Sequence, residues 1–144
     1  MASTAAPPET LATDLKDVLR GKVEDEKIEA AATKVATTVT AYSAHGSVAS
    51  LIFYLKVQVV VDNGKTFDGN AWGVAFPGGG ALFGDVYTDD INALYSNTVS
   101  FAITATPVYT AVYFFDSHSN LLGHFQAGSV STVGGSGGGK GSWS

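Results

Sequence analysis

The fold is decided by one stretch, residues 51–76, which reads LIFYLKVQVVVDNGKTFDGNAWGVAF. Apolar side chains occupy the odd positions from Leu51 to Val61, and the even positions carry mostly polar ones. Successive side chains of a strand point to opposite faces, so this alternation predicts a long half-buried strand. Asn63-Gly64 follows, a strong hairpin signal because both residues tolerate positive φ. The chain then returns as a strand with mostly small residues on one face.

The rest of the body repeats this plan. Each half reads as strand, strand, polar hairpin, strand, glycine-rich turn and strand, and a short helix that begins at Thr88 separates the two halves. The glycine-rich turns are expected at residues 77–80 and 134–139. The predicted strands are residues 35–43, 51–62, 66–76, 81–88, 99–106, 109–115, 121–130 and 140–144.

These elements predict an all-β fold with one short helix. They fit either a two-sheet sandwich or a closed eight-stranded antiparallel β-barrel built from two similar four-strand halves. Only 15% of the residues are charged, so few charges are available to protect exposed strand edges from aggregation. Closure removes such edges, and the barrel is therefore favoured. An eight-stranded barrel has room for its own side chains or for one small ligand.

The N-terminal segment differs in composition from the body. Residues 1–34 are rich in charge and contain no aromatic residue, since the first aromatic is Tyr42. A segment without aromatics has little to anchor it in a core. Amphipathic spacing from Leu11 to Leu19 predicts a short helix, which alone would be marginal in water. We expect residues 1–34 to be a mobile or loosely docked segment and residues 35–144 to form the barrel domain.

Charge and composition exclude several classes of function. The formal net charge of -5 argues against nucleic-acid binding, which depends on basic side chains. The chain has no cysteine, so disulfides, thiolate metal sites and cysteine nucleophiles are excluded. No apolar run is long enough for a transmembrane helix. Residues 1–10 lack the features of a signal peptide, which predicts either an intracellular protein or a mature form.

No motif predicts catalysis, a cofactor or a metal. The stretch from Gly134 to Lys140 approaches a phosphate-binding loop, but Gly141 stands where that loop needs serine or threonine. The histidine spacings match no zinc pattern, so surface or turn positions are expected for them. These histidines are His45, His118 and His124. Nor does a nucleophile lie in a strand-to-helix elbow. An enzyme is therefore not expected.

Four aromatic side chains are the candidates for contact with a partner. If they point outward, they could contact a protein, a glycan or a lipid; otherwise they are ordinary sheet surface. These tentative contact residues are Tyr54, Trp72, Tyr113 and Phe114.

Two further stretches carry a family resemblance. Residues 73–101 read GVAFPGGGALFGDVYTDDINALYSNTVSF, and residues 114–143 read FFDSHSNLLGHFQAGSVSTVGGSGGGKGSW. With SVASLIFYLKVQ at residues 47–58, they resemble the virulence-associated protein (Vap) family of pathogenic rhodococci. The resemblance implies a compact eight-stranded antiparallel barrel with one helix. It supplies no catalytic residues. It covers the chain roughly from Ala44 to the end, and the N-terminal third does not carry it.

The resemblance implies a secreted or cell-surface virulence protein that acts in the host phagosome, here without its signal peptide. We expect a non-enzymatic protein whose outer surface contacts a host membrane lipid or a host protein, with no cofactor. The alternative is a carrier of a small apolar molecule inside the barrel. Because the body has few titratable groups, we also expect it to resist unfolding at acidic pH.

Overall fold

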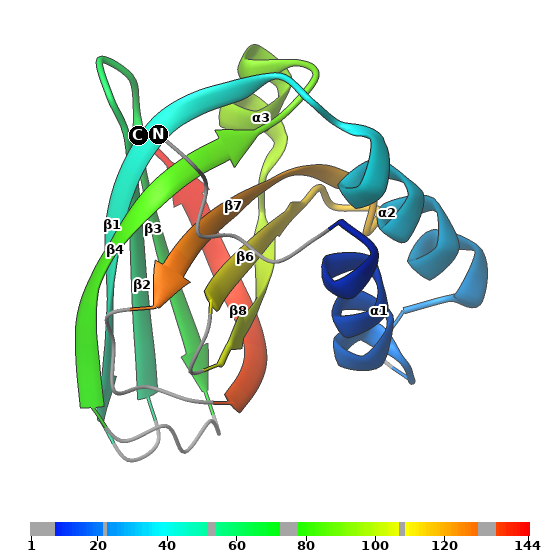
Figure 1. Cartoon of the computed structure of the whole chain (residues 1–144), viewed down its shortest axis with the longest axis horizontal. Coiled ribbons are helices and arrows are strands. Elements are labelled where there is room, and N and C mark those ends of the chain that lie inside the picture. Colours follow the sequence, from blue (N-terminus) through cyan, green and yellow to red (C-terminus); the bar gives the residue numbers. More distant parts are fainter. Residues whose placement is uncertain (1–7, 22, 52–53, 73–77, 107–108, 130–134) are drawn as a thin grey trace.

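The computed structural model describes residues 8–21, 23–51, 54–72, 78–106, 109–129 and 135–144. In these parts of the chain, eight strands form the body, two helices precede them and a third helix stands between the fourth and fifth strands (Figure 1). The helices are α1 (Pro8–Leu19), α2 (Asp25–Thr37) and α3 (Ile91–Asn97). The strands are β1 (Ala41–Leu51), β2 (Tyr54–Val61), β3 (Thr66–Trp72), β4 (Gly78–Tyr87), β5 (Ser100–Ala105), β6 (Tyr109–Phe115), β7 (Leu121–Ser129) and β8 (Gly135–Trp143).

The strands close into an antiparallel barrel in the order β1-β2-β3-β8-β5-β6-β7-β4. In the first half, β4, β1, β2 and β3 are neighbours in that order, and β8, β5, β6 and β7 repeat it in the second half. Each half is a Greek key, in which the fourth strand returns to lie beside the first. The two keys join through the pairs β3–β8 and β4–β7. The predicted barrel of two similar halves is confirmed.

The two polar hairpins lie where the sequence predicts them. Asn63 connects β2 to β3 with a φ of 60°, and Ser119 connects β6 to β7 with a φ of 64°. In the second hairpin, Oδ1 of Asp116 accepts hydrogen bonds from the backbone N–H of His118 at 2.8 Å and of Asn120 at 2.9 Å. Such a side-chain-to-backbone bond stabilises a turn locally, which is why short polar residues predict one.

The first strand begins later than the sequence predicts. It was expected over residues 35–43, but β1 begins at Ala41 and Val35 lies in α2. Val35 continues the helical spacing of the buried residues Ile28 and Ala31, so its side chain belongs to the apolar face of a helix. The expected boundary between the N-terminal segment and the barrel therefore falls inside α2.

Both glycine-rich stretches belong to strands in their described parts, which corrects the prediction of turns. Gly78 opens β4, and Gly135–Gly139 forms the first half of β8; Pro77 and Gly134 lie outside the described residues. Glycine has a low intrinsic preference for strands. However, β8 is hydrogen-bonded to β3 on one side and β5 on the other. Pairing on both sides within the closed barrel overrides the local preference.

The helix between the two halves is capped by Asp90, not by Thr88 as predicted. Oδ1 of Asp90 accepts a hydrogen bond from the backbone N–H of Ala93 at 3.0 Å, so it satisfies one of the free donors at the helix start. Thr88 is buried, and its hydroxyl donates to the carbonyl oxygen of Leu122 at 2.7 Å. Thr88 therefore ties the end of β4 to β7.

Large aromatic side chains pack against one another in the barrel interior. The ring centroid of Phe67 lies 4.9 Å from that of Phe114 and 5.6 Å from that of Phe101, both in edge-to-face geometry. Such pairs contribute about 0.5–1.5 kcal/mol beyond the burial of their area. Gly69 and Gly141 make room for these rings: a Cβ atom would lie 2.7 Å from Phe67 at Gly69 and 2.4 Å from it at Gly141. The small residues of β3 and β8 therefore complement the large ring between them.

The helices α1 and α2 pack on the outside of the barrel, beside β5, β6 and β7 (Figure 1). Leu15 of α1 and Ile28 and Ala31 of α2 form an apolar cluster with outward residues of β6 such as Tyr113. The described part of the N-terminal segment is thus helical and docked. This segment has no aromatic residues of its own. Its aliphatic side chains pack against aromatic side chains of the barrel, and this contact anchors it.

Replacement of Gly69 by alanine is expected to lower the free energy of unfolding by about 1–3 kcal/mol, because the added methyl group collides with two buried rings. Urea unfolding with a constant m-value measures the change. Ser142→Ala, at an exposed position of β8, is the control and should stay within about 0.5 kcal/mol of wild type. In a Phe67→Leu background the Gly69→Ala change should cost less; an equal cost would contradict the proposed collision.

Removal of the α3 cap by Asp90→Ala is expected to cost about 1 kcal/mol, since the N–H of Ala93 loses its partner. Asp89→Ala is the matched control, because Asp89 is exposed and adjacent. Thermal unfolding of the two variants side by side checks the assignment. A larger loss for Asp89→Ala than for Asp90→Ala would show that the cap is misassigned.

Candidate functional site on the outer faces of the barrel

The interior of the barrel is apolar and occupied. Leu55, Val57 and Val59 of β2 are fully buried, and they alternate with exposed or half-buried side chains on the same strand. At one end of the aromatic core, the ring centroid of Trp143 lies 5.2 Å from that of Phe114 and 5.2 Å from that of Tyr95. Side chains therefore take the space that a ligand would need at the level of these residues.

The described residues provide no metal cage. Within them, no three His, Asp or Glu side chains come together in a way that could hold a metal ion. The stretch that approaches a phosphate-binding loop is extended as β8 from Gly135, so it does not form a loop around a phosphate. Among the helices described, none is both long and apolar enough to cross a bilayer.

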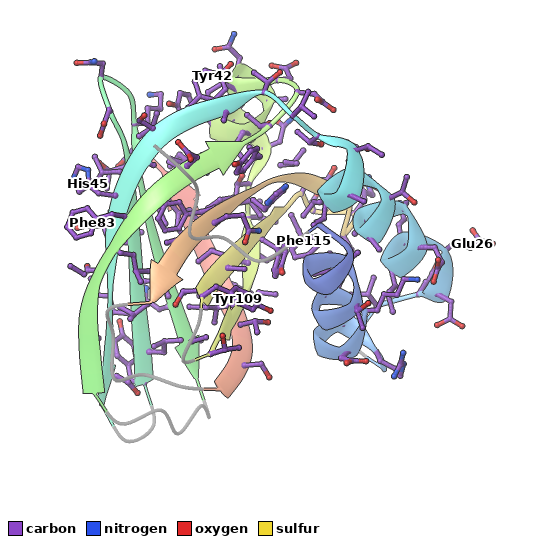
Figure 2. The ribbon with its side chains drawn as sticks, in the orientation of Figure 1. Glu26, Tyr42, His45, Phe83, Tyr109 and Phe115 are labelled. Carbon is purple, nitrogen blue, oxygen red and sulfur yellow. The ribbon has the colours of Figure 1, made fainter. Side chains whose placement is uncertain are left out.

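The outer surface divides into two faces of different character. The open face is formed by the neighbouring strands β3, β2, β1 and β4, and the covered face is formed by β5, β6 and β7 beneath α1 and α2 (Figure 1). Tyr109 and Phe115 lie between β6 and the helices, whereas His45 and Phe83 point away from the barrel on the opposite side (Figure 2). While α1 and α2 are docked, the open face is thus accessible to a partner.

The open face carries a network of polar side chains. Tyr54 donates a hydrogen bond to Oδ1 of Asn70, and Gln58 donates through Nε2 to Oδ1 of Asp68 at 3.2 Å. Nδ1 of His45 lies 3.3 Å from Oδ1 of Asp62, and both side chains are about half exposed. These cross-strand contacts hold the outward side chains of adjacent strands in place.

The candidates taken from the sequence did not include Phe83, an exposed aromatic side chain of this face. Phe83 of β4 is 64% exposed, and its register partner on β1 is His45. The sequence contained a signal for this. Leu82 and Val86 are apolar residues at inward, even-numbered positions of β4, so the odd-numbered position 83 faces outward. Phe83 was overlooked because β4 was predicted only as a strand, without assigning its faces.

The four predicted contact residues have different positions. Tyr54 is half-buried on the open face. Trp72 pairs with Tyr54 through its backbone, but its side chain lies outside the described residues. Tyr113 and Phe114 are fully buried, so the expectation of exposure was wrong for both. Adjacent residues of a strand face opposite sides: Phe114 points into the barrel core, and Tyr113 points outward beneath the helices.

Two of the three histidines are exposed as predicted, but His124 is not. His45 and His118 are exposed, whereas His124 of β7 is only 3% exposed although it faces outward from the barrel. Its ring stacks on Tyr87 at a centroid distance of 5.2 Å and lies 6.3 Å from that of Tyr113. Burial lowers the pKa of His124 to about 4, because the imidazolium form would lose its hydration. Strand alternation predicted that the His124 side chain points outward, but not that it is buried there.

Comparison with known proteins places these features in a family. A family model described as Rhodococcus equi virulence-associated protein matches residues 2–144. The structure of VapB from Rhodococcus equi, with 45% identity and a TM-score of 0.69, covers 73% of this chain and 96% of its own. The structure of VapD from the same organism, with 40% identity and a TM-score of 0.70, covers 73% and 97%. A search of curated proteins returned no match.

Truncation separates the structural aromatics from the exposed one. Phe114→Ala is expected to lower the free energy of unfolding by about 3–5 kcal/mol, since the ring is buried against Phe67 and Trp143. Phe83→Ala removes an exposed ring and should change stability by less than about 0.5 kcal/mol. Denaturant titrations of both variants test the assignment; comparable losses would mean that Phe83 is part of the packing.

Proposed function

The chain belongs to the virulence-associated protein family of Rhodococcus equi, and on that premise we propose that it is a secreted, non-enzymatic protein that acts in the host phagosome. It acts through the outer surface of its barrel on a host membrane or a host protein. VapB and VapD come from an intracellular pathogen, which supports a target inside the host cell.

The occupied interior is the observation that carries this proposal. A small-ligand carrier, the alternative function, needs an open lumen with polar groups that orient its ligand. In the interior, Phe67 packs against Phe101 and Phe114 instead, and the neighbouring Trp143 side chain is nearly fully buried. Side chains in the place of a ligand support recognition through the outer surface.

A non-enzymatic role is supported by the way the polar side chains are distributed. General acid–base and nucleophilic catalysis need a base, a nucleophile and an orienting group within hydrogen-bond distance of one another in a pocket. On the open face, His45 pairs with Asp62, and Gln58 bonds to Asp68 across adjacent strands. They stand on a convex sheet surface, where a substrate would not be enclosed.

The open face is the surface proposed to contact the partner. Its exposed aromatic ring, Phe83, is surrounded by polar and small residues of β1 and β4. An aromatic anchor within a polar surround is typical of a protein interface, where few residues carry most of the binding energy. Tyr54 and Trp72, which are register partners on β2 and β3, extend the same group of strands as proposed contact residues.

Binding to host material tests the proposal. The full-length protein is expected to be retained on host-cell membranes or to capture a host protein, and Phe83→Ser should reduce the bound fraction at least about tenfold, a value typical of a hot-spot residue. Val99→Ser is the matched control, because Val99 is an exposed apolar residue that precedes β5, away from the open face. Its binding should equal that of wild type.

Vesicles of phosphatidylcholine, with and without phosphatidylserine, distinguish the two kinds of partner. Co-sedimentation with vesicles alone indicates a lipid, and capture from lysate without vesicle binding indicates a protein. Absence of both, or an equal loss for Phe83→Ser and Val99→Ser, would contradict a contact through the open face.

A further inference from the structure

The covered face contains two buried polar side chains, His124 and Gln126, each with an atom that has no hydrogen-bond partner. His124 and Gln126 are outward residues of β7, opposite Tyr113 and Ala111 of β6, and these two belong to the cluster that α1 and α2 bury. An outward side chain on a barrel strand is buried only when something outside the barrel covers it. α2 packs on β7, where Lys34 donates a hydrogen bond to the carbonyl oxygen of Leu121 at 3.1 Å.

The surroundings of His124 favour a neutral ring. Its Nδ1 lies 2.7 Å from Nε2 of Gln126, and its Nε2 has no hydrogen-bond partner. A second ring hydrogen would therefore leave a donor of the ring without an acceptor. It would also place a charge in a site where hydration is replaced by aromatic rings.

We propose that α1 and α2 form an acid-released cover: when His124 takes up a proton, the helices undock from β5, β6 and β7 while the barrel stays closed. Undocking lets water reach the imidazolium ring and exposes the aromatic face that includes Tyr109, Tyr113 and Phe115. The release concerns the covered face, so it does not depend on the function proposed for the open face.

The charged groups around His124 do not favour its protonated form. On α2, the ionisable side chains that reach the sheet are Lys27, which bonds to Asn120, and Lys34; both are cations. On β4, burial and then the charge of Asp85 raise the pKa of Tyr87, so that phenol stays neutral in acid. Asp85 itself is the register partner of Gln126, not of His124. Burial is the cause that lowers the pKa of His124 to about 4.

The direction of the pH dependence follows from these values. The ordinary pKa of histidine is 6.5, and the docked state lowers it to about 4, so the undocked state binds the proton more tightly. Docking is strongest above pH 6.5, weakens as the pH falls through the range from 6.5 to about 4, and stays constant below it. Within this range, the equilibrium constant for docking is expected to fall roughly tenfold per pH unit. At pH 5 it is about 30-fold lower than its limit at high pH.

A thiol introduced under the cover measures this release, because the chain has no cysteine of its own. Ala31→Cys places a thiol at a buried position of α2, and Ala36→Cys places one at an exposed position of the same helix. The rate of reaction with a dipyridyl disulfide at Ala31→Cys, divided by that at Ala36→Cys at each pH, cancels the pH dependence of the thiol. The ratio should rise about 20-fold between pH 7 and pH 5.

The same ratio is measured in the full-length chain with His124→Phe, whose ring can stack but cannot titrate, and with His124→Gln as a second neutral replacement. In either folded variant the ratio should be flat with pH, whereas His45→Phe, at an exposed histidine, should leave the rise intact. Near-ultraviolet circular dichroism follows the barrel. A rise that persists without His124, no rise in wild type, or loss of the barrel signal together with the rise would each overturn the proposal.

Discussion

The rings of Phe67, Phe101 and Phe114 must fit into the interior of a small closed barrel, and the rest of the structure depends on that fit. The ring of Phe67 occupies space that a side chain at Gly69 or Gly141 would need. The glycines of β3 and β8 are thus as necessary to the core as the aromatics. Since protein interiors are close-packed, this complementarity fixes which strands can be neighbours across the barrel.

On the outside of the barrel, the two faces differ for a simple physical reason. On β6, Tyr109 and Tyr113 point outward, and such large rings are costly to leave in water. The helices α1 and α2 cover them with the small and aliphatic side chains of an amphipathic surface. On β1 and β4 the outward residues are mostly small or polar, so that face stays open, with Phe83 as its exposed ring.

The burial of His124 on the covered face bears on how the protein responds to acidic pH. The composition of residues 35–144 predicts resistance to acid, because few groups titrate, and that stays a prediction for the barrel. His124 is an exception that the composition hides. It is one histidine among three, but it is buried beside Tyr87 and Tyr113. The proposed release of α1 and α2 by protonation of His124 would change the cover and leave the core of the barrel intact.

The sequence by itself determined the barrel of two similar halves, the hairpins at Asn63 and Ser119, and the inward face of β2, because alternation and turn residues act over a few neighbouring positions. It could not determine that Gly135–Gly139 is a strand, since that depends on partners distant in the chain. Nor could it show that Tyr113 and His124 are covered while Phe83 is exposed. An outward direction is a local property of a strand, but burial on the outside is decided by which other element packs there, and only the tertiary structure contains that information.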